Sequence, residues 1–480
     1  MRVREEIQEV LRQEQEGLSL WRYPALGLYN LLYFLAFTAW SPWVVWRVAT
    51  KKRYREGVLD RVGFPARRES SGPLAWVHGV SVGEIKASIP LVRALEDRRP
   101  DLEILFSSTT PTGHGLARRL FPGRRVVYFP LDFWFMPSVS QARIRPDLVL
   151  LMELELWPNF VTAARRRGCP VIVVNGRISR RSFSRYRKVR PILPQLDCID
   201  LFCMQNEEYA SRILGLGVDP ARVRVTGNMK YDALVVREEP RPDGEFARIT
   251  GKGDGRLVLV GGSTHGEEEE VLQRAAMELR RRTGRKILLV LAPRHPERGE
   301  GVLSSLRRMG ARAERLTDFR SGRLEDPLPA DSTLLVDTIG DLEKAYSVAD
   351  LVFVGGSLTS RGGQNMLEPA AMARPVLVGP NTWNFHADVT LLKEARGLVQ
   401  VEDEESLLSE LERLVREPGA REELGARARA VILAQKGAAR RTLQALEEGG
   451  WLPPRSGSLS PLGKEEGIPK GPLDRDRAMF

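Results

Sequence analysis

Short apolar runs alternate with longer amphipathic stretches over most of the chain. The amphipathic stretches, such as 84–95, 267–282 and 420–447, repeat their apolar residues at the helical period. The apolar runs are continuous, and alternation of such runs with helices is typical of parallel sheets that are covered on both faces. We therefore predict an α/β fold with two sets of strands. The expected strands cover 74–77, 104–106, 148–152, 171–174, 201–204 and 223–226 in the first set, and 257–260, 287–291, 334–336, 351–354, 376–378 and 398–401 in the second.

The two sets of strands predict two domains. A chain of 480 residues is too long for one ordinary core. The stretch 232–254 is rich in proline, glycine and charge, and it lacks apolar periodicity. We expect two doubly wound, Rossmann-like domains over 49–231 and 255–450, joined by this linker and facing a cleft. The residues 451–480 are rich in proline, glycine, serine and charge, which predicts a disordered tail.

The segment 23–48 is almost free of charge and carries aromatic residues toward both ends. A membrane-spanning helix needs roughly 20 apolar residues, and aromatic side chains gather at bilayer interfaces. We expect a membrane-anchoring helix here, preceded by an N-terminal extension, 1–22. The alternative is an interfacial helix that kinks at Pro42. Basic residues in 51–55 follow at once, and by the positive-inside tendency they predict that the large C-terminal body is cytoplasmic.

The charge and the cysteine count narrow the class of protein. The formal net charge of +11 is compatible with nucleic acid, an anionic membrane or an anionic substrate. The expected anchor favours a lipid surface over nucleic acid. Three cysteines at irregular spacing are too few for a disulfide framework or a zinc knuckle, so a reducing compartment is the simplest inference.

A glycine-rich turn follows the expected strand 351–354 and leads into a helix that starts near Asn365. Glycines at the carboxyl end of a strand let the backbone approach a ligand closely, and a helix N-terminus offers free N–H groups. This combination suits a phosphate or a nucleotide. Asn365 and Glu368 are three residues apart, so both project from one face of the first turn. They would contact the ligand or, alternatively, form a capping box.

Similar loops follow other strands of the second half. Arginine side chains and backbone N–H groups suit a phosphate, and a carboxylate suits ribose hydroxyls. Three such loops at adjacent strand ends predict a site for a nucleotide or a nucleotide-sugar. Lys230, where the two domains meet, would reach a phosphate or remain in solvent. The other candidate residues are Ser263, Thr264, His265, Arg294, His295, Gly363, Asn365 and Glu368.

In the first domain, acidic side chains follow the strand ends. Glu84 lies where the chain turns from a strand into a helix, and it either faces the cleft or only complements the helix dipole. Glu153 and Glu155 follow a buried strand, where two carboxylates are costly unless they are paired or used. Arg177 is a candidate partner for one of them. A hydroxyl-rich loop, 107–112, opens the next helix along from Glu84.

These loops, taken together and in this order, resemble those of the 3-deoxy-D-manno-octulosonic acid (Kdo) transferases, which add Kdo to the lipid A precursor. The resemblance extends over about 23 to 448. Its blocks are 78–84, 109–113, 153–159, 205–207, 227–232, 262–265, 293–298 and 362–369.

The resemblance implies a GT-B glycosyltransferase fold and an inverting transfer from CMP-Kdo to a hydroxyl of the lipid A precursor (lipid IVA), with no metal or other cofactor. It places the enzyme at the inner membrane of a lipopolysaccharide-making bacterium, with both catalytic domains on the cytoplasmic face. Glu84 matches the general base, and Glu153 or Glu155 matches a second essential acid.

The resemblance also divides the remaining candidates between the two substrates. On the donor side, Arg294, Asn365 and Glu368 match residues that hold CMP. On the acceptor side, Ser81, Thr109, Thr110 and Arg177 are the candidates. Two other functions remain open: a GT-B transferase or epimerase that uses a UDP-sugar, and a membrane-tethered nucleotide-binding scaffold.

Overall fold

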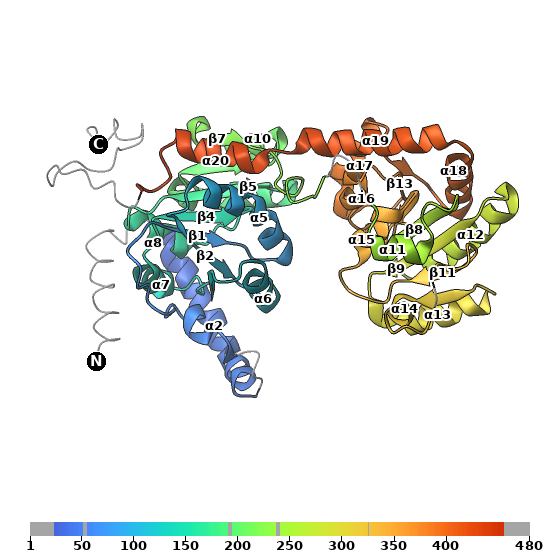
Figure 1. The fold of residues 1–480 in the computed structure, drawn as a ribbon. Helices are drawn as coiled ribbons and strands as arrows, with labels where there is room; N and C mark the ends of the chain where they lie inside the picture. The colour runs from blue at the N-terminus through green and yellow to red at the C-terminus, as the bar shows by residue number, and fades with distance from the viewer. Residues whose placement is uncertain (1–23, 51–54, 191–193, 237–240, 325, 456–480) are drawn as a thin grey trace. The chain divides into compact units, whose positions relative to one another are not determined.

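The computed structural model describes residues 24–50, 55–190, 194–236, 241–324 and 326–455. The chain forms two compact units (Figure 1). Unit 1 comprises Met1–Thr226 and Ala439–Phe480, and unit 2 comprises Gly227–Ala438. The predicted two domains are present, but the chain returns to unit 1 at its C-terminal end.

Two local features explain why the boundaries of the two units differ from the predicted domain boundaries. Arg98 forms an ion pair of 2.6 Å with Glu447, so the last helix belongs to unit 1 rather than to the second domain. The expected linker 232–254 contains the helix α11, Gly244–Thr250, and both Phe246 and Ile249 are buried in the core of unit 2. Apolar side chains at only two positions of this short helix gave no periodic signal.

Unit 1 contains a parallel sheet with the strand order β3-β2-β1-β4-β5-β6-β7. The central strands β1 and β4 are buried along their whole length, as continuous apolar runs require. The strands are β1 (Leu74–His78), β2 (Glu103–Ser108), β3 (Arg125–Tyr128), β4 (Leu148–Met152), β5 (Val171–Gly176), β6 (Leu201–Met204) and β7 (Val223–Val225).

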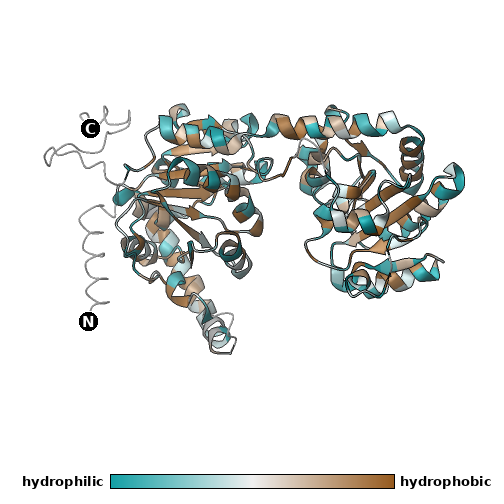
Figure 2. Ribbon diagram, viewed as in Figure 1, coloured by the Kyte–Doolittle hydropathy of each residue, from teal (hydrophilic) through white to brown (hydrophobic). Residues whose placement is uncertain are grey.

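Helices pack around this sheet, and the apolar cluster on one of its faces includes Trp76, Val149 and Phe160. Figure 2 shows the strands mostly in the hydrophobic colour, in agreement with this burial. The helices of unit 1 are α2 (Pro24–Thr50), α4 (Val58–Arg61), α5 (Val82–Arg98), α6 (Pro111–Leu120), α7 (Met136–Ile144), α8 (Pro158–Arg166), α9 (Arg180–Val189), α10 (Glu207–Leu214) and α20 (Ala438–Glu448).

Unit 2 also contains a parallel sheet, with the strand order β10-β11-β9-β8-β12-β13-β14. Alternate residues of β8 enter two different apolar clusters, Val258 and Val260 in one and Leu257 and Leu259 in the other. The sheet is therefore covered on both faces. Its strands are β8 (Leu257–Thr264), β9 (Ile287–Pro293), β10 (Ala313–Arg315), β11 (Thr333–Leu335), β12 (Leu351–Val354), β13 (Val376–Val378) and β14 (Val399–Gln400).

The helices of unit 2 begin largely where the sequence indicates. The expected helix 420–447 is instead two helices, because Gly437, with φ +95°, interrupts it between Gln435 and Ala438. In addition to α11, the helices are α12 (Glu268–Thr283), α13 (Gly299–Arg308), α14 (Leu316–Arg320), α15 (Leu342–Val348), α16 (Leu367–Ala371), α17 (His386–Glu394), α18 (Glu404–Arg416) and α19 (Pro418–Gln435).

The helix α2 forms over the segment expected to be an anchor, and it continues through Pro42. None of the helices in the described ranges combines the length and the apolar content that a bilayer crossing needs. The expected extension 1–22 lies outside the described residues. Most of the expected disordered tail does too, but its first residues are ordered, since Arg99 donates hydrogen bonds to the carbonyls of Pro453 and Pro454.

Candidate functional site

In unit 1, the acidic candidates follow the two strands at which the strand order reverses. β1 has β2 on one side and β4 on the other, so the connections after β1 and β4 leave in opposite directions. Ligands of doubly wound sheets bind at the carboxyl ends of strands at such a point. Glu84 follows β1, and Glu153 and Glu155 follow β4.

Glu84 is bound within its own helical turn. Its Oε2 atom accepts a hydrogen bond of 2.8 Å from the N–H of Val80, and its Oε1 atom accepts from the N–H and the hydroxyl of Ser81, at 3.2 and 2.6 Å. The Ser81 hydroxyl in turn accepts from the Glu84 N–H, which completes a capping box. Glu84 therefore has a structural role at the start of α5, and its catalytic role remains a prediction.

Glu153 and Glu155 differ in their surroundings. Glu153 has φ +58°, a left-handed conformation that costs a non-glycine residue about 1–3 kcal/mol and is common at functional sites. Its Oε2 atom accepts a hydrogen bond of 2.8 Å from Nε of Arg177, so the predicted pairing with Arg177 is confirmed. Glu155 is half-buried, and burial raises its pKa to about 7. The charges of Glu84 and Glu153 raise the pKa of Glu155 further, so the three carboxylates lie within electrostatic reach of one another.

This environment makes Glu155 a group that exchanges a proton near neutral pH. A carboxyl whose pKa lies near the working pH suits general acid–base catalysis, and strongly shifted groups cluster at functional sites. The phenol of Tyr186 lies close enough for the charge of Glu155 to help raise the pKa of Tyr186. The carboxyl ends of β1 and β4 therefore present a group of interacting acids that could take a proton from a substrate.

We expect Glu155→Gln to stabilise unit 1 at high pH. The pKa of Glu155 is about 7 in the fold and near 4.5 in the unfolded chain, so folding binds a proton between these values. The stability of the wild type should fall as the pH rises from about 4.5 to about 7. Solvent screens this partly exposed side chain, so above pH 7 the variant should gain a free energy of unfolding on the order of 1 kcal/mol. Unfolding at pH 8 and pH 4 measures it.

The exposed Glu207 of α10 provides the matched control. Glu207→Gln should give no gain in stability at pH 8, because this exposed side chain loses no buried charge on replacement. An equal gain for Glu155→Gln at pH 4 and pH 8 would contradict a raised pKa for Glu155.

The acceptor-side candidates hold the neighbouring loops together. The hydroxyls of Ser108 and Thr110 both donate hydrogen bonds of 3.0 Å to the carbonyl of Val80, which joins the β2 loop to the loop that carries Glu84. Thr110 also accepts from the N–H of Gly113 and so caps α6. Thr109 is half-buried next to it. Thr110 and Ser81 thus have structural roles, and their contact with a substrate stays a prediction.

In unit 2, three strand-end loops meet at His265. The rings of His265 and His295 lie 5.5 Å apart between centroids, and the side-chain nitrogen of Gln364 lies 3.4 Å from Nε2 of His265. The backbone N–H of Arg294 donates to the carbonyl of Thr264 at 3.0 Å. The loops after β8, β9 and β12 are therefore neighbours, as the sequence predicted, and β8 and β12 flank the point where this sheet reverses its strand order.

Positive charge gathers around this meeting point. Burial lowers the pKa of His265, and the charges of His295, Arg361, Arg298 and Arg294 lower it further. Arg298 is neutralised by the buried Glu269 at 3.1 Å. In the described part of the chain, the side chains of Arg294 and Arg361 form no ion pair and both residues are exposed. Two free guanidinium groups beside two imidazoles suit a phosphate.

The glycine turn after β12 holds an internal carboxylate. Glu268 is 1% exposed, and its two oxygens accept hydrogen bonds from five backbone N–H groups, those of His265, Gly356, Ser357, Leu358 and Thr359. The distances lie between 2.7 and 3.4 Å. The chain's own anion therefore occupies these N–H groups, and binding of a phosphate elsewhere in the glycine-rich turn and at the start of α16 stays a prediction.

Asn365 and Glu368 form a pair at the start of α16. Nδ2 of Asn365 donates to Glu368 at 2.9 Å, and Oδ1 of Asn365 accepts from the N–H of Leu367. This bond reaches the N–H two residues on, so the pair is not the capping box considered above. Gly363, with φ +79°, is buried just before them. Both side chains are half-buried, and their roles toward a nucleotide remain predictions.

Lys230 forms an ion pair that the sequence did not predict. Its ammonium group donates a hydrogen bond of 2.7 Å to Asp388, and the hydroxyl of Tyr231 donates to the other oxygen of that carboxylate at 2.6 Å. Asp388 is buried. The pairing partly compensates the charge of Lys230, so Lys230 would attract a phosphate less strongly than an unpaired lysine.

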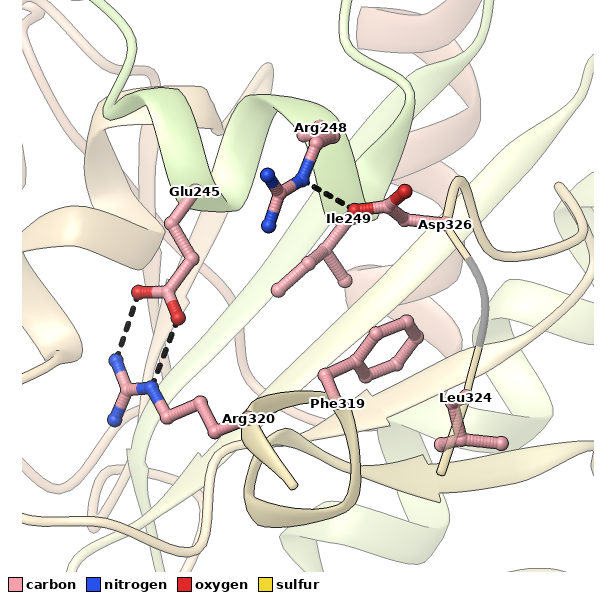
Figure 3. A pocket seen from close by; sticks show the side chains of 7 residues that line it. All are labelled: Glu245, Arg248, Ile249, Phe319, Arg320, Leu324 and Asp326. Carbon is pink, nitrogen blue, oxygen red and sulfur yellow. Dashed lines mark hydrogen bonds and ion pairs between the residues drawn. The ribbon is translucent and has the colours of Figure 1, made fainter. Parts of the chain in front are cut away.

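A pocket of about 640 Å³ in unit 2 lies apart from these loops (Figure 3). Its charged lining residues pair with one another, Glu245 with Arg320 at 2.8 Å and Arg248 with Asp326. Figure 3 shows these pairs beside the apolar side chains of Ile249, Phe319 and Leu324, which also line the pocket. None of the residues predicted from the sequence lines this pocket. Across the described ranges, no three His, Cys, Asp or Glu side chains gather in a way that could hold a metal ion.

Comparisons with known proteins place these sites in context. A family model described as 3-deoxy-D-manno-octulosonic-acid transferase (kdotransferase) matches residues 56–233. A 3-deoxy-D-manno-octulosonic acid transferase from Haemophilus influenzae is 34% identical over 82% of this chain and 92% of its own.

Two solved structures are also similar. The C-terminal CMP-Kdo binding domain of WaaA from Acinetobacter baumannii is 29% identical, covering 37% of this chain and 90% of that one, with a TM-score of 0.34. The UDP-GlcNAc 2-epimerase from Neisseria meningitidis, bound to UDP-GlcNAc, is 14% identical, covering 78% of this chain and all of that one, with a TM-score of 0.52. At that identity the second likeness concerns the fold alone.

Proposed function

Because this chain belongs to the family of 3-deoxy-D-manno-octulosonic acid transferases, we propose that it moves Kdo from CMP-Kdo to a hydroxyl of the lipid A precursor lipid IVA in lipopolysaccharide biosynthesis. The observation that carries the proposal is the pair of sites described above. Unit 1 offers interacting carboxylates at a strand-order reversal, and unit 2 offers a cationic group of loops at the equivalent place.

The carboxylates of unit 1 suit the acceptor. The acceptor hydroxyl attacks the anomeric carbon of Kdo, the bond from that carbon to the CMP phosphate breaks, and the hydroxyl proton goes to a base. We assign the base to Glu84 and the second acid to Glu155, whose pKa of about 7 lets it share the proton at neutral pH. Attack opposite to the departing phosphate inverts the anomeric centre.

The cationic loops of unit 2 suit the donor. CMP leaves with a phosphate that gains negative charge as the bond breaks, and guanidinium groups held in place stabilise such charge without reorganisation. Arg294 and Arg361 are the exposed cations at this place. Arg361 was not among the residues predicted from the sequence, although it stands in the glycine-rich turn after β12 that the sequence singled out.

The surface of α2 suits a lipid. Its exposed side chains include tryptophans at three positions, one of them 73% exposed. Such an exposed apolar surface matches contact with lipid, and we propose that α2 lies against the inner membrane with both units on its cytoplasmic face. Sedimentation with lipid vesicles tests this placement. Among the described side chains of α2, the large apolar ones that are exposed are Leu28, Leu31, Leu32, Phe34, Leu35, Phe37, Trp40, Trp43 and Trp46.

Product mass tests the proposed function directly. Incubation of the full chain with CMP-Kdo and lipid IVA should add the mass of one or more Kdo residues to the lipid. If lipid IVA keeps its mass with active-site variants and wild type alike, the proposal is wrong and the nucleotide-binding scaffold gains support.

The donor assignment predicts that CMP, but not UDP, raises the midpoint of thermal unfolding. Arg294→Ala should weaken CMP binding by at least about tenfold, because a charge-assisted hydrogen bond is worth about 1.5–3 kcal/mol. Arg308→Ala, an exposed arginine at the end of α13, is the control and should leave CMP binding unchanged. Titration calorimetry measures both. Stabilisation by UDP instead of CMP would favour a UDP-sugar enzyme.

A further inference from the structure

The helix α2 makes side-chain hydrogen bonds to the body of unit 1 at two adjacent positions. The hydroxyl of Tyr29 donates to Asp132 at 3.1 Å. The amide of Asn30 exchanges two hydrogen bonds with the amide of Asn159, at 3.2 and 3.0 Å, and its oxygen also accepts from the backbone N–H of Trp134. These hydrogen bonds add to ring contacts of Tyr33, Phe34 and Phe37 with Phe133, whose ring centroids lie 5.6, 6.3 and 6.4 Å away.

Asp132 lies at the centre of the contacts between α2 and the body of unit 1. It is 1% exposed, and its carboxylate accepts from the backbone N–H groups of Asn159 and Phe160 at 3.0 and 2.8 Å, in addition to Tyr29. The side chain of Asn159 donates to the carbonyl of Asp132 at 2.7 Å. The first N–H groups of a helix have no partner within it. Because Trp157, at the N-cap of α8, supplies no side-chain cap, Asp132 caps this helix from outside.

The capped turn continues directly from the acidic loop. Residues 153–157 connect the end of β4 with the start of α8 and include Glu153 and Glu155. β4 fixes one end of this loop in the core of the sheet. The contacts of Asp132 and Asn30 fix the other end. A shift of α2 would therefore act on the acidic loop through the contacts of Asp132 and Asn30 with the start of α8, an end that the packing of Phe160 in the core also holds.

We propose that Tyr29 and Asn30 are positioning residues for the acidic loop, so that binding of lipid to the exposed apolar surface of α2 sets the position of Glu155. The kinetic part of this proposal rests on the proposed transferase function. The coupling itself is a property of unit 1. Tyr29 and Asn30 hold Asp132 and the start of α8, and lipid bound to the exposed apolar side chains of α2 would stabilise this arrangement.

Tyr29→Phe combined with Asn30→Ala tests the coupling. The variant should lower kcat about tenfold, the order of one charge-assisted hydrogen bond, and leave the KM for CMP-Kdo unchanged because unit 2 holds the donor. Hydrogen exchange at the backbone N–H groups of 153–160 should become about tenfold faster. Thr38→Val is the control, because the Thr38 hydroxyl donates only to the carbonyl of Leu35 in its own helix.

Vesicles of phosphatidylethanolamine and phosphatidylglycerol supply the lipid arm of the test. They should slow hydrogen exchange over 153–160 in the wild type and in Thr38→Val, but not in the double variant. Tyr29→Phe alone removes one hydroxyl and serves if the double variant folds poorly. It should give a smaller change in the same direction.

The outcomes separate this inference from the proposed function. If the wild type transfers Kdo and the Tyr29 and Asn30 variants match Thr38→Val in both kcat and hydrogen exchange, the coupling is wrong and the transferase stands. If vesicles leave the exchange of 153–160 unchanged in the wild type, the lipid step is wrong. If the wild type transfers nothing, the proposed function fails, and the exchange data still decide whether α2 holds the loop.

Discussion

Replacement of Glu84 by glutamine should lower kcat for Kdo transfer by about 10²- to 10⁴-fold, the usual contribution of a positioned general base. Glutamine keeps the size of the side chain and one oxygen that accepts from Ser81, but it cannot take a proton. Steady-state rates of product formation measure the loss. The free energy of unfolding should also fall, by about 1–3 kcal/mol, because the hydrogen bond from the Val80 N–H is replaced by a buried contact between two donors.

A matched variant separates catalysis from capping. Ser81→Ala removes the hydroxyl that bonds to the Glu84 carboxylate and caps α5, but it leaves the carboxylate in place. Loss of a cap costs about 0.5–2 kcal/mol of stability. If Ser81→Ala lowers kcat as much as Glu84→Gln, the effect belongs to the shape of the turn. If Glu84→Gln keeps the full rate and Glu155→Gln abolishes it, the base is Glu155.

The sequence predicts the location of both sites well, because that information is local. Continuous apolar runs mark the strands, and the residues that follow a run must lie at the carboxyl end of a strand. The runs of β4 and β12 were predicted with their observed bounds. The short strands β3 and β10 were not predicted, because a run of three or four residues with a charged first or last position carries little periodic signal.

Two early-helix glutamates show what the sequence does not determine. Glu84 and Glu268 both stand in the first turn of a helix that follows a strand, and dipole complementarity explains either one. The carboxylate of Glu84 contacts its own turn. That of Glu268 reaches the loop after β12, about 90 positions along the chain. Only the pairing of β8 with β12 brings that loop within reach.

The same limit applies to other long-range partners. Asp388 lies 158 positions from Lys230, and Asp132 lies 103 positions from Tyr29. In each case the two residues are polar groups whose ordinary environment is solvent, so neither pattern nor spacing distinguishes them. The pairing of Glu153 with Arg177 could be predicted from the sequence. Two carboxylates at a buried strand end need a cation nearby, and Arg177 follows the adjacent strand.

Replacement of Glu268 by glutamine should destabilise the donor-side loops of unit 2 by about 2–5 kcal/mol. The carboxylate accepts hydrogen bonds from five backbone N–H groups, and Glu268 is only 1% exposed. Glutamine replaces one of the two oxygens with a hydrogen-bond donor. Whichever oxygen is replaced, at least two buried N–H groups lose their acceptor, and each unsatisfied group costs about 1–3 kcal/mol. Hydrogen exchange at the backbone N–H groups of 356–359 measures the local loss.

The neighbouring Glu267→Gln provides the control, because Glu267 stands at the N-cap of α12 with an exposed side chain. It should change stability by less than about 0.5 kcal/mol. CMP binding should weaken in Glu268→Gln and not in Glu267→Gln, because Glu268 also holds the N–H of His265, around which the cationic loops meet. Unchanged exchange at 356–359 in Glu268→Gln would show that this internal carboxylate does not hold the glycine turn in place.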